Sequence, residues 1–329
     1  MKTIVKRKKN CWPKNNSCIY NQKPPKRWFF HKVPLVGKTI FLFLVLCFGF
    51  NQKVSAVDPL KLYEDSLRQW GNSILSRQSL SERKPANEKM QQVLYKILQS
   101  EAAWNYPFDS LGAIGVLMPA DKAFRIFNWE FPLRDGTYEY FAFFQFPPQQ
   151  GQCKVVELED SRANIKSPER AKLKPENWFG AHYYQLFFKV HKKKKTYFLL
   201  GLDWNNKISR KKIIEPFTIN AGGDISFGAN VFTGIGVGLQ RVIFEYSAEL
   251  SMSLRYNEKR ELIIFDHLVP KSPELKGQYQ FYAPDLSYDA LRFRKGKWQL
   301  KENIDARNEI SELDDKAPLR KKLPEKNRP

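Results

Sequence analysis

Three aspartates and a histidine near the C-terminal end of the chain have the side-chain types that acid–base chemistry needs. Asp266 and His267 close a predicted strand, and Asp285 and Asp289 follow a short way downstream. Two carboxylates and an imidazole could act as general acid and base on a glycosidic bond. The alternative is structural, because Asp before His and Asp near Pro284 are common turn and cap residues that make local backbone hydrogen bonds. We favour the structural alternative.

No other catalytic pattern in the sequence is complete. Gly234, Gly236 and Gly238 are spaced like part of a phosphate-binding loop, but a nucleotide fingerprint needs a helix after the glycines, and here a strand pattern follows. Cys153 has no obvious base partner, and there is no Gly-x-Ser-x-Gly elbow. We therefore expect no cofactor.

Metal binding is not expected either. His182, His191 and His267 are the histidines of the expected mature chain, and no two of them have ligand spacing. The segment Asp203-Trp204-Asn205-Asn206 offers oxygen atoms suited to calcium, but it lacks the acidic residue that closes a calcium loop. Asp and Asn at these positions fit a turn better.

Aromatic residues make up 14% of the chain, including eight tryptophans. If Trp129, Trp178 or Trp204 were exposed, their rings could stack on sugars. Burial in the core is the commoner role for such residues, and it is the one we expect.

The first part of the expected mature chain has helical periodicity. Asp58-Pro59 offers an N-cap followed by proline at the first helical position. Apolar residues then recur at helical spacing and predict helices over 58–78 and 86–103, separated by a polar stretch. Each helix has one apolar face to bury, so the pair should form a hairpin packed on the rest of the fold.

Beyond residue 107 the period falls to two and aromatic and β-branched residues dominate, which is typical of strands. Residues 160–178 are polar and contain two prolines, so they are predicted to form a long surface loop. Because most connections are short turns, neighbouring strands should be antiparallel. The predicted strands are 114–118, 124–131, 137–146, 182–190, 196–202, 208–219, 261–266, 279–282, 288–294 and 298–301.

The longest alternating segment runs from Val242 to Tyr256. At about 3.3 Å per residue it would span roughly 50 Å, which is too long for an ordinary strand. We expect either one bent strand with a bulge or two strands with a break near Ser247.

Together these elements predict a mainly β (α+β) fold. It should contain a large antiparallel β-sheet, closed as a barrel or folded as a sandwich, with the N-terminal helical hairpin packed on it. The predicted domains are a signal peptide with a long basic n-region (1–56), the helical hairpin (57–106), the antiparallel β domain (107–305) and a charged tail that we expect to be disordered (306–329).

Residues 38–56 have the pattern of a secretion signal. Lys38 precedes a mostly apolar run from Ile40 to Phe50, and Val54-Ser55-Ala56 fits signal-peptidase cleavage after Ala56. The run has about half the ~20 residues that a spanning helix needs, so no stable membrane span is expected. The chain should therefore be periplasmic or secreted, and the alternative is an N-terminal membrane anchor.

Cleavage would change the charge of the chain. The whole sequence carries 55 basic and 34 acidic residues, for a net charge of +21. The first 56 residues contain twelve basic residues and no acidic ones, which leaves 43 basic against 34 acidic residues and a net charge of +9. This modest excess does not favour a nucleic-acid partner. Cleavage would also remove three of four cysteines and leave Cys153, so no internal disulfide is expected.

Three strings of residues resemble those of a known family. They are Tyr-Phe-Leu-Leu-Gly-Leu-Asp-Trp-Asn-Asn (197–206), Arg-Val-Ile-Phe-Glu-Tyr-Ser-Ala (241–248) and Phe-Tyr-Ala-Pro-Asp-Leu-Ser-Tyr-Asp (281–289). They are similar to uncharacterised secreted or periplasmic proteins of Bacteroidota, over about residues 58–308. The resemblance implies export to the periplasm of a Gram-negative cell. That family has no known activity, so the resemblance implies no catalytic residue.

The sequence thus predicts an exported periplasmic protein with a binding or envelope-structural role, and the absence of a complete catalytic pattern leans away from an enzyme. The partner is not specified; an envelope glycan or an envelope protein would fit. The alternative is a hydrolase of cell-envelope glycan or peptidoglycan that uses acidic residues at strand ends. It requires Asp266, Asp285 or Asp289 to meet in a cleft, with carboxyl oxygens about 5–10 Å apart.

Overall fold

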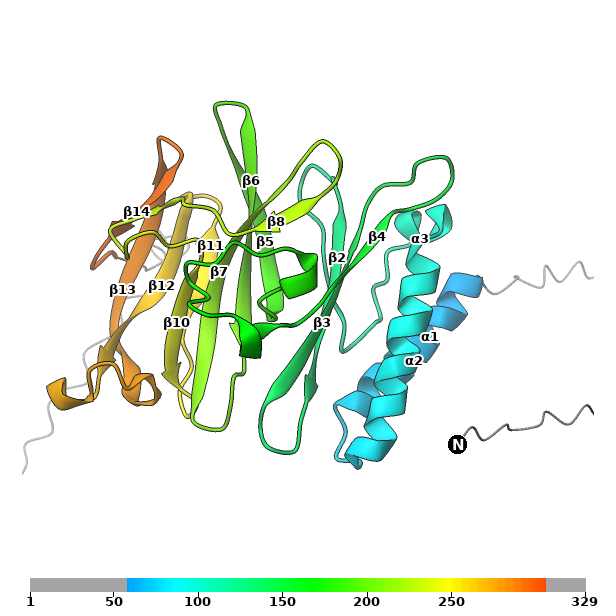
Figure 1. The fold of residues 1–329 in the computed structure, drawn as a ribbon, viewed down its shortest axis with the longest axis horizontal. Helices are drawn as coiled ribbons and strands as arrows, with labels where there is room; N and C mark the ends of the chain where they lie inside the picture. The colour runs from blue at the N-terminus through cyan, green and yellow to red at the C-terminus, as the bar shows by residue number, and fades with distance from the viewer. Residues whose placement is uncertain (1–57, 306–329) are drawn as a thin grey trace, which may run out of the picture. The chain divides into compact units, whose positions relative to one another are not determined.

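The computed structural model describes residues 58–305, and the signal and tail predictions fall on residues outside this range. The described chain is mainly β, with three sheets and an N-terminal helical hairpin, and the sheets pack face to face like a sandwich (Figure 1). The first sheet has the order β1-β2-β3-β4, the second β10-β7-β6-β5 with β8 also on β7, and the third β11-β12-β13-β14-β9. The mainly β sandwich with a helical hairpin is therefore confirmed.

The helices are α1 (Pro59–Ile74), α2 (Leu80–Leu98) and the short α3 (Glu101–Asn105), with one-turn 3-10 helices η1 (Arg162–Asn164), η2 (Pro175–Asn177), η3 (Pro273–Leu275) and η4 (Tyr279–Phe281). The strands are β1 (Gly115–Leu117), β2 (Arg125–Pro132), β3 (Tyr138–Gln145), β4 (Val155–Leu158), β5 (His182–His191), β6 (Lys194–Asp203), β7 (Ser209–Ile219), β8 (Ile225–Phe227), β9 (Phe232–Thr233), β10 (Val242–Ser247), β11 (Leu254–Asn257), β12 (Leu262–Pro270), β13 (Tyr282–Arg294) and β14 (Lys297–Lys301).

The second helix begins six residues earlier than the periodicity predicted. The Glu82 side chain accepts hydrogen bonds from the Ser79 backbone amide, at 2.8 Å, and from the Ser79 hydroxyl, at 2.7 Å. This is one half of a capping box, and it fixes the first turn at Leu80. Pro85 lies in the second turn, where it removes one backbone donor but does not end the helix.

Two buried polar side chains of the first sheet hold the C-terminal ends of α2 and α3. Gln145 donates to the carbonyl of Leu98 at 2.7 Å, and Arg125 donates to the carbonyls of Ala103 and Tyr106. Carbonyl groups at helix ends have no partner within the helix, so these bonds satisfy them and dock the helices on the sheet. Burial lowers the pKa of Arg125 to about 10, which still leaves it charged at neutral pH.

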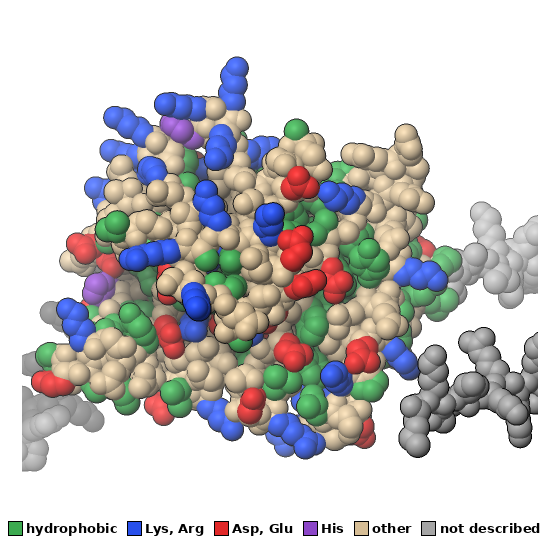
Figure 2. Space-filling view, in the orientation of Figure 1, with side chains coloured by type: hydrophobic (Ala, Val, Ile, Leu, Met, Phe, Trp, Pro, Cys, Tyr) green, Lys and Arg blue, Asp and Glu red, His purple; other side chains and the backbone are tan. Residues whose placement is uncertain are grey.

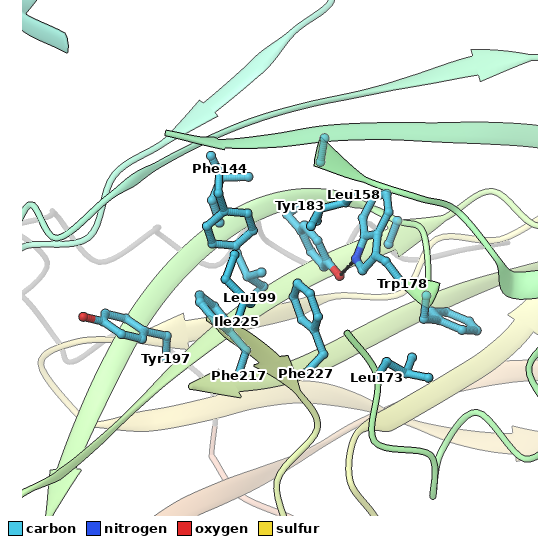
Figure 3. Packing of buried hydrophobic residues seen from close by; sticks show 14 of the residues in the cluster. Phe144, Leu158, Leu173, Trp178, Tyr183, Tyr197, Leu199, Phe217, Ile225 and Phe227 are labelled. Carbon is cyan, nitrogen blue, oxygen red and sulfur yellow. Dashed lines mark hydrogen bonds between the residues drawn. The ribbon is translucent and has the colours of Figure 1, made fainter. Parts of the chain in front are cut away.

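Three apolar cores separate the four layers. The helices pack on one face of the first sheet, around Trp129 and Met90. The other face of the first sheet packs on the second sheet through a cluster that includes Phe144, Phe217 and Trp178, in which the Trp178 indole donates to the Tyr183 hydroxyl at 2.9 Å (Figure 3). The second sheet packs on the third through a further cluster. The strands of the second sheet are therefore covered on both faces.

The alternating segment 242–256 is divided between two sheets. It contains β10 in the second sheet and β11 in the third, with a turn directly after Ser247. The break near Ser247 is therefore the correct alternative, and a single bent strand is not formed. The apolar residues of both strands face the same core because the chain turns between two packed sheets.

Other elements differ from the prediction. Residues 279–281 form the 3-10 turn η4, and the strand starts only at Tyr282. The short strands β4, β8 and β9 were not predicted, and β9 pairs with β14 in parallel over two residues. Long-range pairing stabilises such short strands, and a local pattern of two to four residues does not reveal it.

The loop 160–178 is held to the second sheet by a buried arginine, Arg241, and a half-buried one, Arg162. Arg241, which is fully buried, donates to the Glu215 carboxylate at 2.6 Å and to the carbonyls of Ala171, at 2.9 Å, and Pro168. Arg162 in the loop pairs with Asp203 at 2.6 Å. The polar loop can pack here because the charged groups of Arg241, Glu215, Arg162 and Asp203 have close partners.

Within the described residues no helix is long and apolar enough to cross a membrane.

Candidate anion-binding site

The structure brings two of the four predicted acid–base residues into contact. A register shift in the β12–β13 pair lies between Asp266 and Leu268, at His267. Nδ1 of His267 lies 2.7 Å from Oδ2 of Asp289, whose Oδ1 accepts from the Asn303 amide at 2.9 Å. Asp289 is buried, and its hydrogen bond raises the pKa of His267 although burial opposes the shift.

The other two carboxylates serve the local backbone. Asp266 pairs in register with Tyr288, next to the Phe265–Asp289 pair, so Asp266 and Asp289 point to opposite faces of the sheet. Asp266 accepts from the Ser253 amide at 2.8 Å. Asp285 is exposed and accepts from the hydroxyl and amide of Ser287, which lower its pKa.

This geometry does not suit hydrolysis of a glycosidic bond. A general acid needs a carboxyl group with a raised pKa that faces a second carboxylate. Asp285 has a lowered pKa, and Asp266 and Asp289 lie on opposite faces of the third sheet. Asp285 and Asp266 accept hydrogen bonds from Ser287 and Ser253, and His267 and Asp289 form a pair.

We expect the His267–Asp289 pair to stabilise the fold in a pH-dependent way. Because the pKa of His267 is raised above its ordinary value of 6.5, the pair contributes fully below about pH 6.5 and loses its contribution as the pH rises through the raised pKa. In urea unfolding, His267→Gln should therefore lose more stability, relative to the wild-type chain, at pH 5.5 than at pH 9. An equal loss at both pH values would show that the ion pair is not the cause.

Other residues singled out in the sequence lie in structural roles. Trp129 and Trp178 are fully buried and offer no face for stacking on a sugar, whereas Trp204 is half-buried, with its ring stacked against Tyr138. His182 lies 2.6 Å from a Glu130 oxygen. The described residues contain no group of three His, Cys, Asp or Glu side chains that could hold a metal ion.

A large hollow lies elsewhere, at one end of the core between the first and second sheets. We call it the basic pocket; its volume is about 1120 Å³. Three connections form its walls: the β3–β4 connection, the β5–β6 turn and the β7–β8 turn. Four lysines line it, and its apolar lining comes from Ala123, Phe146, Pro147, Pro148, Tyr197 and Ile219.

The first wall is anchored to the helical layer. Cys153 donates its amide to the carbonyl of Gln99 at 2.8 Å, which ties the β3–β4 connection to the end of α2. The next residue, Lys154, lies with its ammonium over the Phe146 ring, 5.6 Å from the centroid, and donates to the carbonyl of Gly223 at 3.2 Å. The thiol of Cys153 is buried, which raises its pKa and makes it a poor nucleophile.

The second wall is the β5–β6 turn, which includes the exposed lysines 192–195. Asp121 holds the base of this turn in place. The Oδ2 atom of Asp121 accepts from the ammonium of Lys195 at 2.5 Å and from the hydroxyl of Tyr197 at 2.9 Å. Burial acts to raise the pKa of Asp121, but these hydrogen bonds outweigh it and hold the pKa below its ordinary value. The turn thus carries a fixed lysine at its base and free lysines at its tip.

The third wall is the β7–β8 turn, closed by paired hydrogen bonds between Asn220 and Asp224. The Asn220 amide side chain donates to Asp224 at 2.9 Å, and the Asp224 backbone amide donates back to Asn220 at 2.9 Å. Gly223 adopts a φ of 76°, the left-handed region that favours glycine, and directs its carbonyl to Lys154. The first and third walls therefore support each other.

The pocket is positive, although Asp121 neutralises one of its lysines, Lys195. Lys154, Lys193, Lys194 and Lys195 line it, and no acidic residue is among the residues that form its lining. In Figure 2 lysine and arginine side chains gather at the top and upper left, over the tip of β5 and β6 and over the turn between β13 and β14. Positive side chains that converge around a concave, partly apolar lining attract anions and hold them out of bulk water. The site can bind a carboxylate, phosphate or sulfate group.

The sequence contained a signal for this site that was assigned to a turn. The predicted connection over Lys192–Lys195 is shorter in the structure, where only Lys192 and Lys193 lie between β5 and β6 and the other two lysines begin β6. Four successive lysines at one hairpin also indicate a positive surface. Lys154 is distant in sequence and joins the cluster only through the packing of the sheets.

No protein-family model matches the chain, and no curated protein matches it significantly.

Proposed function

We propose that this chain is an exported binding protein whose basic pocket holds an anionic ligand. The observation that carries the proposal is the pocket itself, about 1120 Å³ in volume and lined by four lysines without an acidic residue. Its walls are fixed by hydrogen bonds that leave Lys193 and Lys194 free at the rim. A preformed site of this kind lowers the entropic cost of binding.

The proposal retains export to the periplasm, on the basis of residues 38–56 and the resemblance to secreted proteins of Bacteroidota. Cleavage after Ala56 would remove a segment with twelve positive charges and leave the basic pocket intact. We expect the exported chain to begin at Val57. Intact-mass measurement of the protein recovered from the periplasm checks this, and a mass that includes residues 1–56 would support the membrane-anchored alternative.

Titration calorimetry with a short anionic ligand tests the binding function. Digalacturonate, which carries two carboxylates, should bind the purified protein saturably, and maltose, a neutral disaccharide, should not. Because the attraction acts between charges near the surface, raising the salt concentration to 1 M should weaken binding strongly. Equal heats for the two sugars, or no binding of digalacturonate at low salt, would contradict the proposal.

A further inference from the structure

We propose that the ligand is an elongated acidic glycan that occupies the basic pocket and continues around Thr218 into two further hollows. This inference rests on the proposed function and extends it to the class and length of the ligand. Its basis is that the three hollows are contiguous and that lysines line all of them.

The continuity follows from shared residues. The second hollow, of about 520 Å³, shares Lys154, Thr218, Asn220 and Gly223 with the basic pocket and extends to Ser226. We call it the middle hollow.

The third hollow, of about 400 Å³, shares Thr218 and Ser226 with the middle hollow, and we call it the far hollow. Thr218 therefore belongs to all three hollows. Together they form one groove over the β7–β8 connection, and a single compact ligand would fill only the first of them.

The second sheet separates the two ends of this groove. Along β6, Lys195 and Tyr197 face the basic pocket, whereas Thr196 and Phe198 face the far hollow. A chain molecule must therefore pass around the edge formed by Thr218 and Ser226. Lys194, at the tip of the turn, lines both ends.

The charge of the groove indicates a ligand with repeated negative groups. Lys174 lines the middle hollow, and Lys172, Lys189 and His191 line the far hollow. Lys189 is already paired with Glu261 at 2.5 Å, so Lys172 is the free basic residue that we assign to the ligand there. The acidic residues that line the groove are Glu176 and Asp224, both in the middle hollow. Positive groups spaced along a groove match a polyanion better than a single anion.

The remaining lining favours a glycan over a nucleic acid. Amide and hydroxyl side chains lie between the lysines and can exchange hydrogen bonds with sugar hydroxyls; examples are Gln149, Gln152, Asn220, Ser226 and Asn230. Single-stranded nucleic acids are instead held by exposed aromatic faces on which bases stack. Here the rings of Tyr197 and Phe198 are buried, and the Lys154 ammonium lies over the ring of Phe146. Phe293, which lines the far hollow, is half-buried and packs against Trp298 with the ring centroids 5.2 Å apart.

The test compares oligogalacturonates of two, four, eight and twelve residues on the full chain by calorimetry. Affinity should rise at least tenfold from the dimer to the octamer. Lys172→Glu/Lys174→Glu should cancel most of this gain and leave dimer binding unchanged, whereas Lys154→Glu should weaken binding at every length. Lys84→Glu/Lys89→Glu, at exposed positions on α2, is the matched control for net charge and should change nothing.

Four results would overturn the inference. Dimer and octamer could bind equally, which would leave the basic pocket as a site for a short anion and keep the proposed function. The Lys172→Glu/Lys174→Glu variant could retain the full gain with length. Twelve-residue oligothymidylate could bind more tightly than the octagalacturonate, which would indicate a nucleic-acid site. Failure of every oligogalacturonate to bind would overturn the proposed function as well.

Discussion

The variant Lys193→Glu/Lys194→Glu should bind octagalacturonate at least a hundredfold more weakly than the wild-type chain. Two unit charges in contact at an exposed site attract by about 1 kcal/mol in water, and reversal turns this attraction into a repulsion of similar size. Two reversals therefore exceed the roughly 2.8 kcal/mol that corresponds to a hundredfold change. Both side chains are exposed at the tip of the β5–β6 turn, so the fold should be unaffected.

Lys84→Glu/Lys89→Glu changes the net charge by the same amount at exposed positions on α2, outside the lining of the groove. It separates a local contact from a general loss of positive charge, because long-range effects would weaken binding in both variants. If the two variants lost affinity equally, the β5–β6 turn would not be part of the site. Urea unfolding of both variants should give the wild-type midpoint and thus confirm that neither change acts through stability.

The second large effect concerns stability. Arg241→Met should lower the free energy of unfolding by about 3–5 kcal/mol at neutral pH, because it leaves the Glu215 carboxylate buried without its cation. Both side chains are fully buried, and their atoms lie 2.6 Å apart. The change also removes the donors to the carbonyls of Pro168 and Ala171, which hold the loop 160–178 on the second sheet.

The pH dependence identifies the cause of this loss. Burial raises the pKa of Glu215, and Arg241 opposes that shift in the wild-type chain. Without Arg241 the folded pKa rises further above the unfolded value, so the penalty is small at pH 4 and grows as the pH rises through the unfolded pKa. Urea unfolding at pH 4 and pH 7 measures the difference, with Glu215→Leu/Arg241→Met as the matched control. This double variant should recover part of the stability and lose the pH dependence, whereas an equal loss at both pH values would contradict the account.

The fold could be predicted where the sequence pattern is long and local. The helical hairpin and the longer strands follow from runs of residues with one period, and the short turns made antiparallel neighbours a sound inference. The layering of three sheets was not predictable. It depends on the chain passing from one sheet to the next after Ser247, and alternation continues unchanged across that turn because both strands face one core.

The functional residues, like the layering of the sheets, depend on long-range packing that a local sequence pattern does not reveal. Sequence reasoning chose Asp266, His267, Asp285 and Asp289 because their side-chain types are reactive and their positions are close in sequence. The structure places two of them on opposite faces of a sheet and a third, exposed, in the irregular part of β13. The basic pocket instead joins Lys154 to the β5–β6 turn, about forty residues later, and lysine is too common at surfaces to mark a site before its neighbours are known.

Protection of lysines from acetylation tests the central claim most directly. The full chain is treated with acetic anhydride with and without saturating octagalacturonate, and the rate at each lysine is measured by mass spectrometry. Binding in the basic pocket predicts that Lys154, Lys193 and Lys194 react at least threefold more slowly, while the exposed reference residues Lys84, Lys89 and Lys259 keep their rates. Unchanged rates at the pocket lysines, or equal slowing at the reference lysines, would contradict the account.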